Sequence, residues 1–163
     1  MGKADLVIAG MSPDPDRDAS FSHIYYDTTQ CVMVRKADLE KYKDAASLTG
    51  KTVGAQASSA QEKAAKAELP SSKLISLQKI PDLLLNLNTG KSDALVMEKF
   101  VAKTYLQTHK DMAIAFDLNY DTAGCAIAVK KGNDTLLQQV NETVDAAIKD
   151  GTLNQYVEQA SVL

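Results

Sequence analysis

From about Thr52 onward, short apolar runs alternate with longer segments of helical character. The expected strands cover residues 51–56, 73–77, 93–97 and 112–116, and the expected helices cover residues 59–69, 81–89 and 98–108. Pro70 stops the first of these helices, and Gly90 is a natural C-terminal stop for the second. Strands that alternate with helices are typical of a parallel sheet joined by crossover helices. The sequence therefore predicts a compact α/β unit built on a parallel sheet.

Strands and helices are also expected on both sides of this unit. Three further strands are predicted at residues 6–9, 30–34 and 125–129. Asn133 or Asp134 then caps a helix. The apolar residues of this helix recur on one face: Leu136, Leu137, Val140, Val144, Ala147 and Ile148. Gly151 ends it, and a last short helix over residues 152–159 is expected to dock on the same sheet.

One short segment occurs twice in the chain. Gly2–Ile8 (GKADLVI) is repeated as Gly90–Val96 (GKSDALV). In the second copy, the glycine ends a predicted helix and the aspartate opens a predicted strand. Two interpretations stay open: chance similarity, or two α/β lobes built on one plan. On the second interpretation the chain lacks the start of its first lobe, on the order of 60 residues at about 30 residues per βαβ unit.

Length and composition exclude several classes of protein. The 163 residues fit one domain with at most a short second one. Lys and Arg number 18 against 21 Asp and Glu, so the net charge of −3 provides no basic field for nucleic-acid binding. No apolar run approaches the roughly 20 residues of a membrane-spanning helix. The start at Met1 has no secretory-signal pattern, which leaves the compartment open.

The residue types that carry most catalytic and metal chemistry are sparse. Cys31 and Cys125 form neither a CxxC nor a CxxH pattern, so no zinc site or dithiol centre is indicated. Free thiols are favoured, with a disulfide between the two as the alternative. His23 and His109 lie outside any hydrolase, metalloprotease or nucleotide-binding motif. We therefore expect no metal, no cofactor and no catalytic constellation.

A candidate anion site lies at the start of a predicted helix. Residues 58–62 read SSAQE and contain an S-x-x-E capping box, with Ser59 as N-cap and Glu62 at the third helical position. This helix start directly follows a predicted strand. Free N–H groups and the positive end of the helix dipole suit a small carboxylate there. The alternative is that the helix is merely well capped.

Two charged residues are further candidates for binding. Arg17 follows an expected strand, and its guanidinium binds a carboxylate bidentately, with the Gly10 backbone and the Ser12 hydroxyl as additional partners. Glu98 stands at the end of another expected strand, where its carboxylate can hold an ammonium group. The alternatives are a solvated turn around Arg17 and a first-turn helix charge at Glu98.

Taken in order, several segments resemble the amino-acid-binding solute receptors of ABC importers, which have the type II periplasmic-binding-protein fold. They cover nearly the whole chain: Gly2–Met11, Asp16–Arg17, Phe21–Tyr26, Leu48–Gly54, Gly90–Ala94 and Gly124–Asn133. The resemblance implies an α/β fold with two lobes joined by two crossover strands, at about residues 28–35 and 121–129. The first lobe would be incomplete, because the family's first strand and first helix would lie upstream of Met1.

The resemblance also assigns lobes and roles. Residues 1–30 would form part of lobe 1, residues 31–124 lobe 2 with the crossover strands, and residues 125–163 the return to lobe 1 with the C-terminal helices. Six residues are expected to contact the ligand: Gly10, Ser12 and Arg17 from lobe 1, and Ser59, Ala60 and Glu98 from lobe 2. The glutamate would take the α-ammonium group of an amino acid, and the others its α-carboxylate.

Two positions depart from the family's pattern. Asp14 stands where the family usually has Thr or Ser, and Ser58 stands where it usually has Gly. Both lie beside residues that are expected to bind the α-carboxylate. The departures therefore concern how the carboxylate is held.

The implied function is capture of a free, polar L-amino acid by lobe closure and its delivery to the membrane permease of an ABC transporter. No bond is made or broken, so the chain is not expected to be an enzyme. The expected location is extracytoplasmic, in the periplasm or on the cell surface through a lipid anchor outside this chain. Two other uses of the same fold stay open: a ligand-sensing domain of a signalling receptor and a dehydratase-type enzyme.

Overall fold

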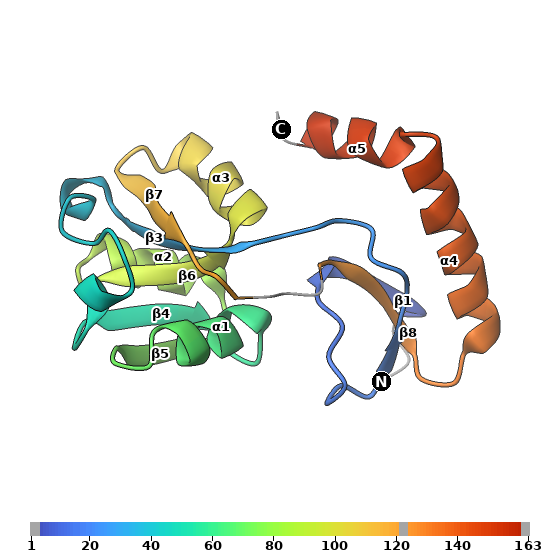
Figure 1. Ribbon diagram of the computed structural model, residues 1–163, viewed down its shortest axis with the longest axis horizontal. Coiled ribbons are helices and arrows are strands. Elements are labelled where there is room, and N and C mark those ends of the chain that lie inside the picture. Colours follow the sequence, from blue (N-terminus) through green and yellow to red (C-terminus); the bar gives the residue numbers. More distant parts are fainter. Residues whose placement is uncertain (1–3, 121–123, 161–163) are drawn as a thin grey trace. The chain divides into compact units, whose positions relative to one another are not determined.

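The computed structural model describes residues 4–120 and 124–160. The chain divides into two compact units. Unit 1 contains Met1–Asp27 and Ala123–Leu163, and unit 2 contains Thr28–Thr122. Figure 1 shows both units and labels most of their helices and strands. Within the described residues, no helix combines the length and the apolar character needed to cross a membrane.

Unit 2 is built on a five-stranded sheet with the order β5-β4-β6-β3-β7. Its strands are β3 (Gln30–Arg35), β4 (Thr52–Gln56), β5 (Lys73–Leu77), β6 (Ala94–Glu98) and β7 (Met112–Asp117). β4 pairs in parallel with β5 and β6, whereas β3 runs antiparallel to β6 and β7. The predicted parallel sheet is therefore wrong in one respect, because β3 separates β7 from β6. Residues 30–34 of β3 are all buried, as a central strand covered on both faces requires.

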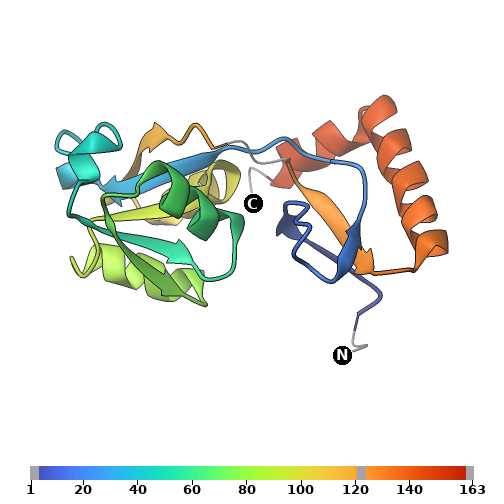
Figure 2. The ribbon, with the colours of Figure 1, turned by 60° about the horizontal axis from the view of Figure 1, so that its bottom comes forward.

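Helices cover both faces of this sheet (Figures 1 and 2). They are α1 (Ala60–Glu68), α2 (Ile80–Asn88) and α3 (Lys99–Thr108), and two short 3₁₀ helices, η1 (Lys36–Asp38) and η2 (Ala46–Leu48), follow β3. Alternate residues of β3 point to opposite faces. Val32 and Val34 pack with residues of α1, whereas Cys31 and Met33 pack with residues of α2 and α3. The three α-helices lie within one residue of their predicted ends.

Unit 1 contains a smaller sheet and two helices. The sheet has the order β1-β8-β2, and both outer strands run antiparallel to β8. The elements are β1 (Leu6–Met11), β2 (Ala19–Phe21), β8 (Ala126–Lys130), α4 (Asp134–Lys149) and α5 (Thr152–Ala160). The prediction missed β2, because three residues are too few to show an alternating pattern.

The helices of unit 1 differ in how much they bury. Asn133 caps α4 by accepting a hydrogen bond from the Leu136 amide, which settles the two alternatives for the cap. Val140 and Val144 of α4 pack against Val129 of β8. We expected α5 to dock on the sheet, but its residues are not buried. It contacts α4, and its Tyr156 is 62% exposed.

The two cysteines belong to different units. Cys31 lies in unit 2 and Cys125 in unit 1; both are buried, and they are not joined by a disulfide. Burial, reinforced by Asp117 and Glu98, raises the pKa of Cys31 to about 12. The Cys31 thiol therefore stays protonated at neutral pH, as is usual for a cysteine buried in apolar surroundings.

Candidate functional site

The carboxyl ends of β4 and β6 form one edge of the unit 2 sheet. These two strands are parallel neighbours, so the residues that follow them lie at the same edge. Ser59 and Ala60 come just after β4, and Glu98 is the last residue of β6. The structure therefore brings the three predicted ligand residues of lobe 2 to one sheet edge. Ligands of open α/β sheets bind at such an edge.

The start of α1 has the predicted capping arrangement with a shift of one residue. Ser59 is the N-cap, and its hydroxyl oxygen accepts a hydrogen bond from the Glu62 amide at 3.3 Å. The Glu62 carboxylate accepts from the Ser58 amide at 2.8 Å, one residue before the amide that a standard capping box uses. The first N–H groups of a helix have no backbone partner within the helix. The Glu62 amide is taken by the Ser59 hydroxyl, so the amides of Ala60 and Gln61 are the ones offered to an anion.

Ser58 has an unusual backbone conformation. Its φ of 57° lies in the left-handed region, and among the described residues it is the one non-glycine with a positive φ. Glycine adopts this region without strain, whereas a residue with a Cβ atom does so at a cost. Ser58 therefore has a backbone conformation that favours glycine.

The Glu98 carboxylate caps α3. It accepts hydrogen bonds from the Phe100 amide at 2.9 Å, from the Val101 amide at 2.8 Å and from the Thr28 hydroxyl. The alternative of a helix-start charge thus describes what Glu98 does within unit 2. An ionised carboxylate has about four acceptor positions, so one more donor, such as an ammonium group, can still be bound.

Two glutamines at this edge were not predicted. The Gln61 side-chain amide, in the first turn of α1, donates to the side-chain oxygen Oε1 of Gln30 at 2.9 Å. Gln30 is 1% exposed and is the pairing partner of Glu98 in the ladder between β3 and β6. The available signal was a polar residue at the head of the apolar run CVMV. The partner could not be read from the pattern because it lies 31 residues away.

The three predicted residues of lobe 1 lie in or after β1. The pairing of β1 with β8 shifts between Val7 and Met11, and Gly10 in this stretch has a φ of 60°. A residue in the left-handed region at a bulge is commonly glycine. Ser12 follows β1 and is partly buried. These features place Gly10 and Ser12 at the end of a strand, as expected.

Arg17 has an acidic neighbour, Asp14. The Arg17 Nε atom lies 3.8 Å from the Asp14 Oδ2 atom, and the Arg17 amide donates to the Asp14 carbonyl at 3.1 Å. The Arg17 side chain is 36% exposed. A ligand carboxylate at Arg17 would therefore share the guanidinium with Asp14, or displace it.

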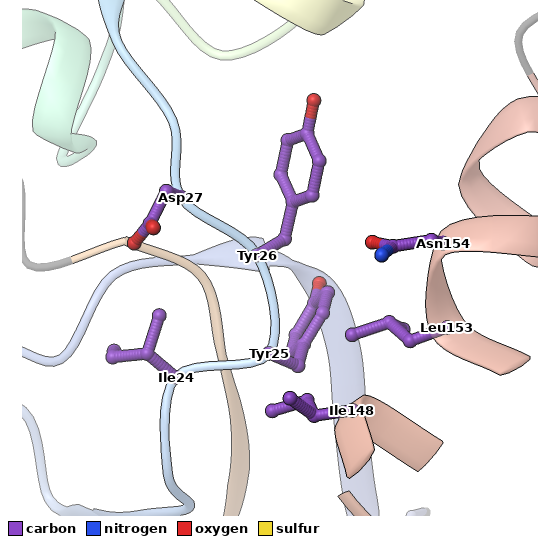
Figure 3. A pocket seen from close by; sticks show the side chains of 7 residues that line it. All are labelled: Ile24, Tyr25, Tyr26, Asp27, Ile148, Leu153 and Asn154. Atoms are coloured by element: carbon purple, nitrogen blue, oxygen red, sulfur yellow. The ribbon is translucent and has the colours of Figure 1, made fainter. Parts of the chain in front are cut away.

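A pocket of about 330 Å³ lies in unit 1, apart from the predicted residues (Figure 3). It is lined by Ile24, Tyr25, Tyr26, Asp27, Ile148, Leu153 and Asn154. The lining comes from the segment before β3, the end of α4 and the first turn of α5. Apolar and aromatic side chains dominate it, with one carboxylate and one amide. Among the described residues, no cluster of His, Cys, Asp or Glu suits a metal ion.

Comparison with known proteins decides the family. Residues 1–160 match the family model of bacterial extracellular solute-binding proteins, family 3. The chain belongs to this family. The type II periplasmic-binding-protein fold expected from the sequence is confirmed, because the chain superposes closely on the solved structure of an amino acid ABC transporter substrate-binding protein.

Three relatives illustrate the similarity. The ABC transporter arginine-binding protein 1 of Escherichia coli K12 is 29% identical over 96% of this chain and 66% of its own length. The arginine-binding extracellular protein ArtP of Bacillus subtilis is 31% identical over 94% of this chain and 61% of its own length. An amino acid ABC transporter substrate-binding protein from Streptococcus pneumoniae, bound to L-arginine, superposes with a TM-score of 0.91 at 34% identity.

The matches cover nearly all of this chain but only part of each matched protein. The Streptococcus pneumoniae match covers 99% of this chain and 69% of that chain. The chain spans less than two thirds of the length of the two curated relatives, at 66% and 61%. The relatives are named as binding proteins.

Proposed function

We propose that this chain binds a free, polar L-amino acid outside the cytoplasmic membrane and delivers it to the permease of an ABC transporter. The observation that carries the proposal is the sheet edge of unit 2, where a helix start and a carboxylate stand at the ends of neighbouring strands. The first suits an anion and the second a cation, as the two charged groups of an amino acid require. Membership of the solute-binding family supports the same ligand class.

In this proposal, unit 2 is lobe 2 and unit 1 is part of lobe 1. The α-carboxylate binds Arg17, Ser12 and the Gly10 backbone of unit 1 together with the Ser59–Ala60 helix start of unit 2. Glu98 takes the α-ammonium group. The lobes close on the ligand and reopen, with no change in covalent bonds. The protein is a receptor and not an enzyme, and it acts in the periplasm or on the cell surface through a lipid anchor.

L-arginine is the first ligand to test. Both curated relatives described above are named as arginine-binding, and the Streptococcus pneumoniae protein is bound to L-arginine. The choice agrees with a net charge of −3, which favours a cationic ligand at long range.

A thermal-shift panel of the common L-amino acids tests the proposal. It is run on this chain and on a version extended at the amino end by about 60 residues. A ligand at about 100 times its Kd adds ~2.7 kcal/mol, which raises the Tm by several degrees. A response to one or a few amino acids in either protein supports the proposal. If neither protein shows a shift in Tm, the proposal fails and a sensor of another ligand is favoured. Turnover of a candidate substrate would instead favour an enzyme.

Matched variants locate the binding groups. Arg17→Met and Glu98→Gln are expected to weaken binding of the responding amino acid at least tenfold, because each removes a charge-assisted contact. Lys149→Met, at the end of α4, and Glu68→Gln, at the end of α1, remove the same charges elsewhere. These controls should bind as the unmodified protein does. Equal losses in variants and controls would show that net charge, and not the proposed contacts, governs affinity.

A further inference from the structure

Gln30 is a polar side chain buried in the core of unit 2. It is 1% exposed and is the first residue of β3, the strand that lies between β6 and β7. Strand alternation places it on the same face as Val32 and Val34, which pack against α1. Burying an amide costs free energy unless it is hydrogen-bonded. The hydrogen bond that the Gln61 side-chain amide donates to the Gln30 Oε1 atom, at 2.9 Å, is therefore a specific feature of this core.

Gln30 contacts both halves of the candidate site in unit 2. Through its side chain it holds Gln61, which follows Ser59 and Ala60 in the first turn of α1. Through its backbone it pairs with Glu98 in the ladder between β3 and β6. One residue thus links the anion-binding helix start to the carboxylate at the end of β6.

We propose that Gln30 is a positioning residue that sets the spacing between the start of α1 and the Glu98 carboxylate. The inference rests on the proposed function, and it assigns the recognition of the zwitterionic α-carbon group to this spacing. A site that is held in its binding geometry before the ligand arrives loses less entropy on binding. Gln30 itself does not touch the ligand; it acts through Gln61 and Glu98.

The competing explanation is that the glutamine pair only stabilises the fold. The two roles separate by measurement, because replacing a buried polar pair by apolar groups of similar shape can leave stability nearly unchanged. A purely structural pair would affect every ligand alike. A positioning pair would affect ligands that use both the helix start and Glu98 more than ligands that use Glu98 alone.

The experiment compares Gln30→Met, Gln61→Leu and the double variant by calorimetric titration. The ligands are the amino acid that responds most strongly in the thermal-shift panel and the decarboxylated amine with the same side chain. The amino acid is expected to bind Gln30→Met about three- to tenfold more weakly, the loss of one hydrogen bond. The amine should keep its affinity, and the double variant should bind no more weakly than Gln30→Met. Ser92→Ala is the matched control, since Ser92 is 2% exposed and lies before β6, at the opposite edge of the sheet.

Each other outcome overturns a specific part of the inference. Unchanged amino-acid affinity in Gln30→Met, or equal losses for the amino acid and the amine, would remove the positioning role. If the unmodified protein binds no amino acid, the proposed function fails. The glutamine link is then tested by the melting temperatures of the same variants. If the shifts of the two single variants do not sum to that of the double variant, Gln30 and Gln61 are coupled; additive shifts refute the link between α1 and β3.

Discussion

From the aspartate onward, the two copies of the repeated segment form the same local structure in very different surroundings. In both copies a strand begins one residue after the aspartate, β1 after Asp5 and β6 after Asp93. Residues 94–96 of β6 are at most 1% exposed, whereas Leu6, Val7 and Ile8 of β1 are 37%, 43% and 61% exposed. β6 lies between β4 and β3, and β1 is an edge strand. The repeat therefore encodes the strand, while the neighbours of the strand determine its burial.

The aspartates of the repeat differ in the same way. Asp93 accepts a hydrogen bond from the Tyr42 hydroxyl at 3.0 Å and another from the Thr52 amide at 2.9 Å. It thereby joins the start of β6 to Tyr42 and to the first residue of β4. Asp5 is exposed. The aspartate of the second copy thus accepts two hydrogen bonds within unit 2, whereas the aspartate of the first copy stands in solvent before β1.

Truncation of equivalent apolar residues should have the largest effect. Leu95 and Val7 occupy the same place in the repeat, but Leu95 is 0% exposed. Leu95→Ala is expected to lower the free energy of unfolding by about 3 kcal/mol, because it removes core contacts and leaves a cavity. Val7→Ala should cost about 1 kcal/mol or less. Urea unfolding followed by circular dichroism measures both, and equal losses would contradict the assignment of β1 as an exposed edge.

Removal of the aspartates should follow the same order. Asp93→Ala is expected to cost about 2 kcal/mol, since it leaves the Tyr42 hydroxyl and the Thr52 amide without their acceptor. Burial, and then the bond to Asp93, raises the pKa of Tyr42, so the variant should also bring this pKa back toward its ordinary value. Ultraviolet absorbance during an alkaline titration detects that change. Asp5→Ala is the control and should stay within about 0.5 kcal/mol.

Acid should weaken unit 2 through Asp38. Hydrogen bonds from Lys41 and Arg35 hold the pKa of this carboxyl below its usual range, and its side chain is 11% exposed. Because the folded-state pKa is lowered, the stabilisation is present above the unfolded value of about 3.9 and is lost as the pH falls through the folded value. Asp38→Asn should therefore cost about 1 to 2 kcal/mol at pH 7 and little at about pH 2.

The matched carboxylate in unit 1 is Asp145. It contacts His23 at 2.9 Å, but the two side chains are 55% and 59% exposed. Asp145→Asn should change the free energy of unfolding at pH 7 by about 0.5 kcal/mol or less, as for other surface pairs. Urea unfolding at pH 7 measures both variants. A larger loss of stability in Asp145→Asn than in Asp38→Asn would contradict the expectation that the carboxylate of unit 2 contributes more stability than that of unit 1.

Local signals predicted most elements of both units. The S-x-x-E pattern at Ser59, the stop at Gly90 and the cap at Asn133 or Asp134 each act within a few residues, so they can be read from the sequence. The insertion of β3 between β6 and β7 is a long-range pairing that no local pattern specifies. The three-residue β2 is too short to show a period.

The candidate site was also predictable only where local signals mark its residues. Ser59 and Glu98 stand out because they follow strands, and parallel strands bring such residues to one edge. The bond between Gln61 and Gln30 was not predictable, because it joins two elements whose packing the sequence pattern does not specify. The strained backbone of Ser58 became visible only with its φ angle.

A small gain in stability is predicted at a polar residue that the first copy of the repeat lacks. Ser92 corresponds to Ala4, and its buried hydroxyl oxygen has no hydrogen-bond partner within residues 4–120 and 124–160. An unsatisfied buried hydroxyl costs free energy, and removing it costs only a small void. Ser92→Ala, which makes the second copy resemble the first, should raise the free energy of unfolding by about 1 kcal/mol in urea unfolding. A loss of stability instead would mean that the hydroxyl is bonded in solution, and that the second copy needs a polar residue where the first does not.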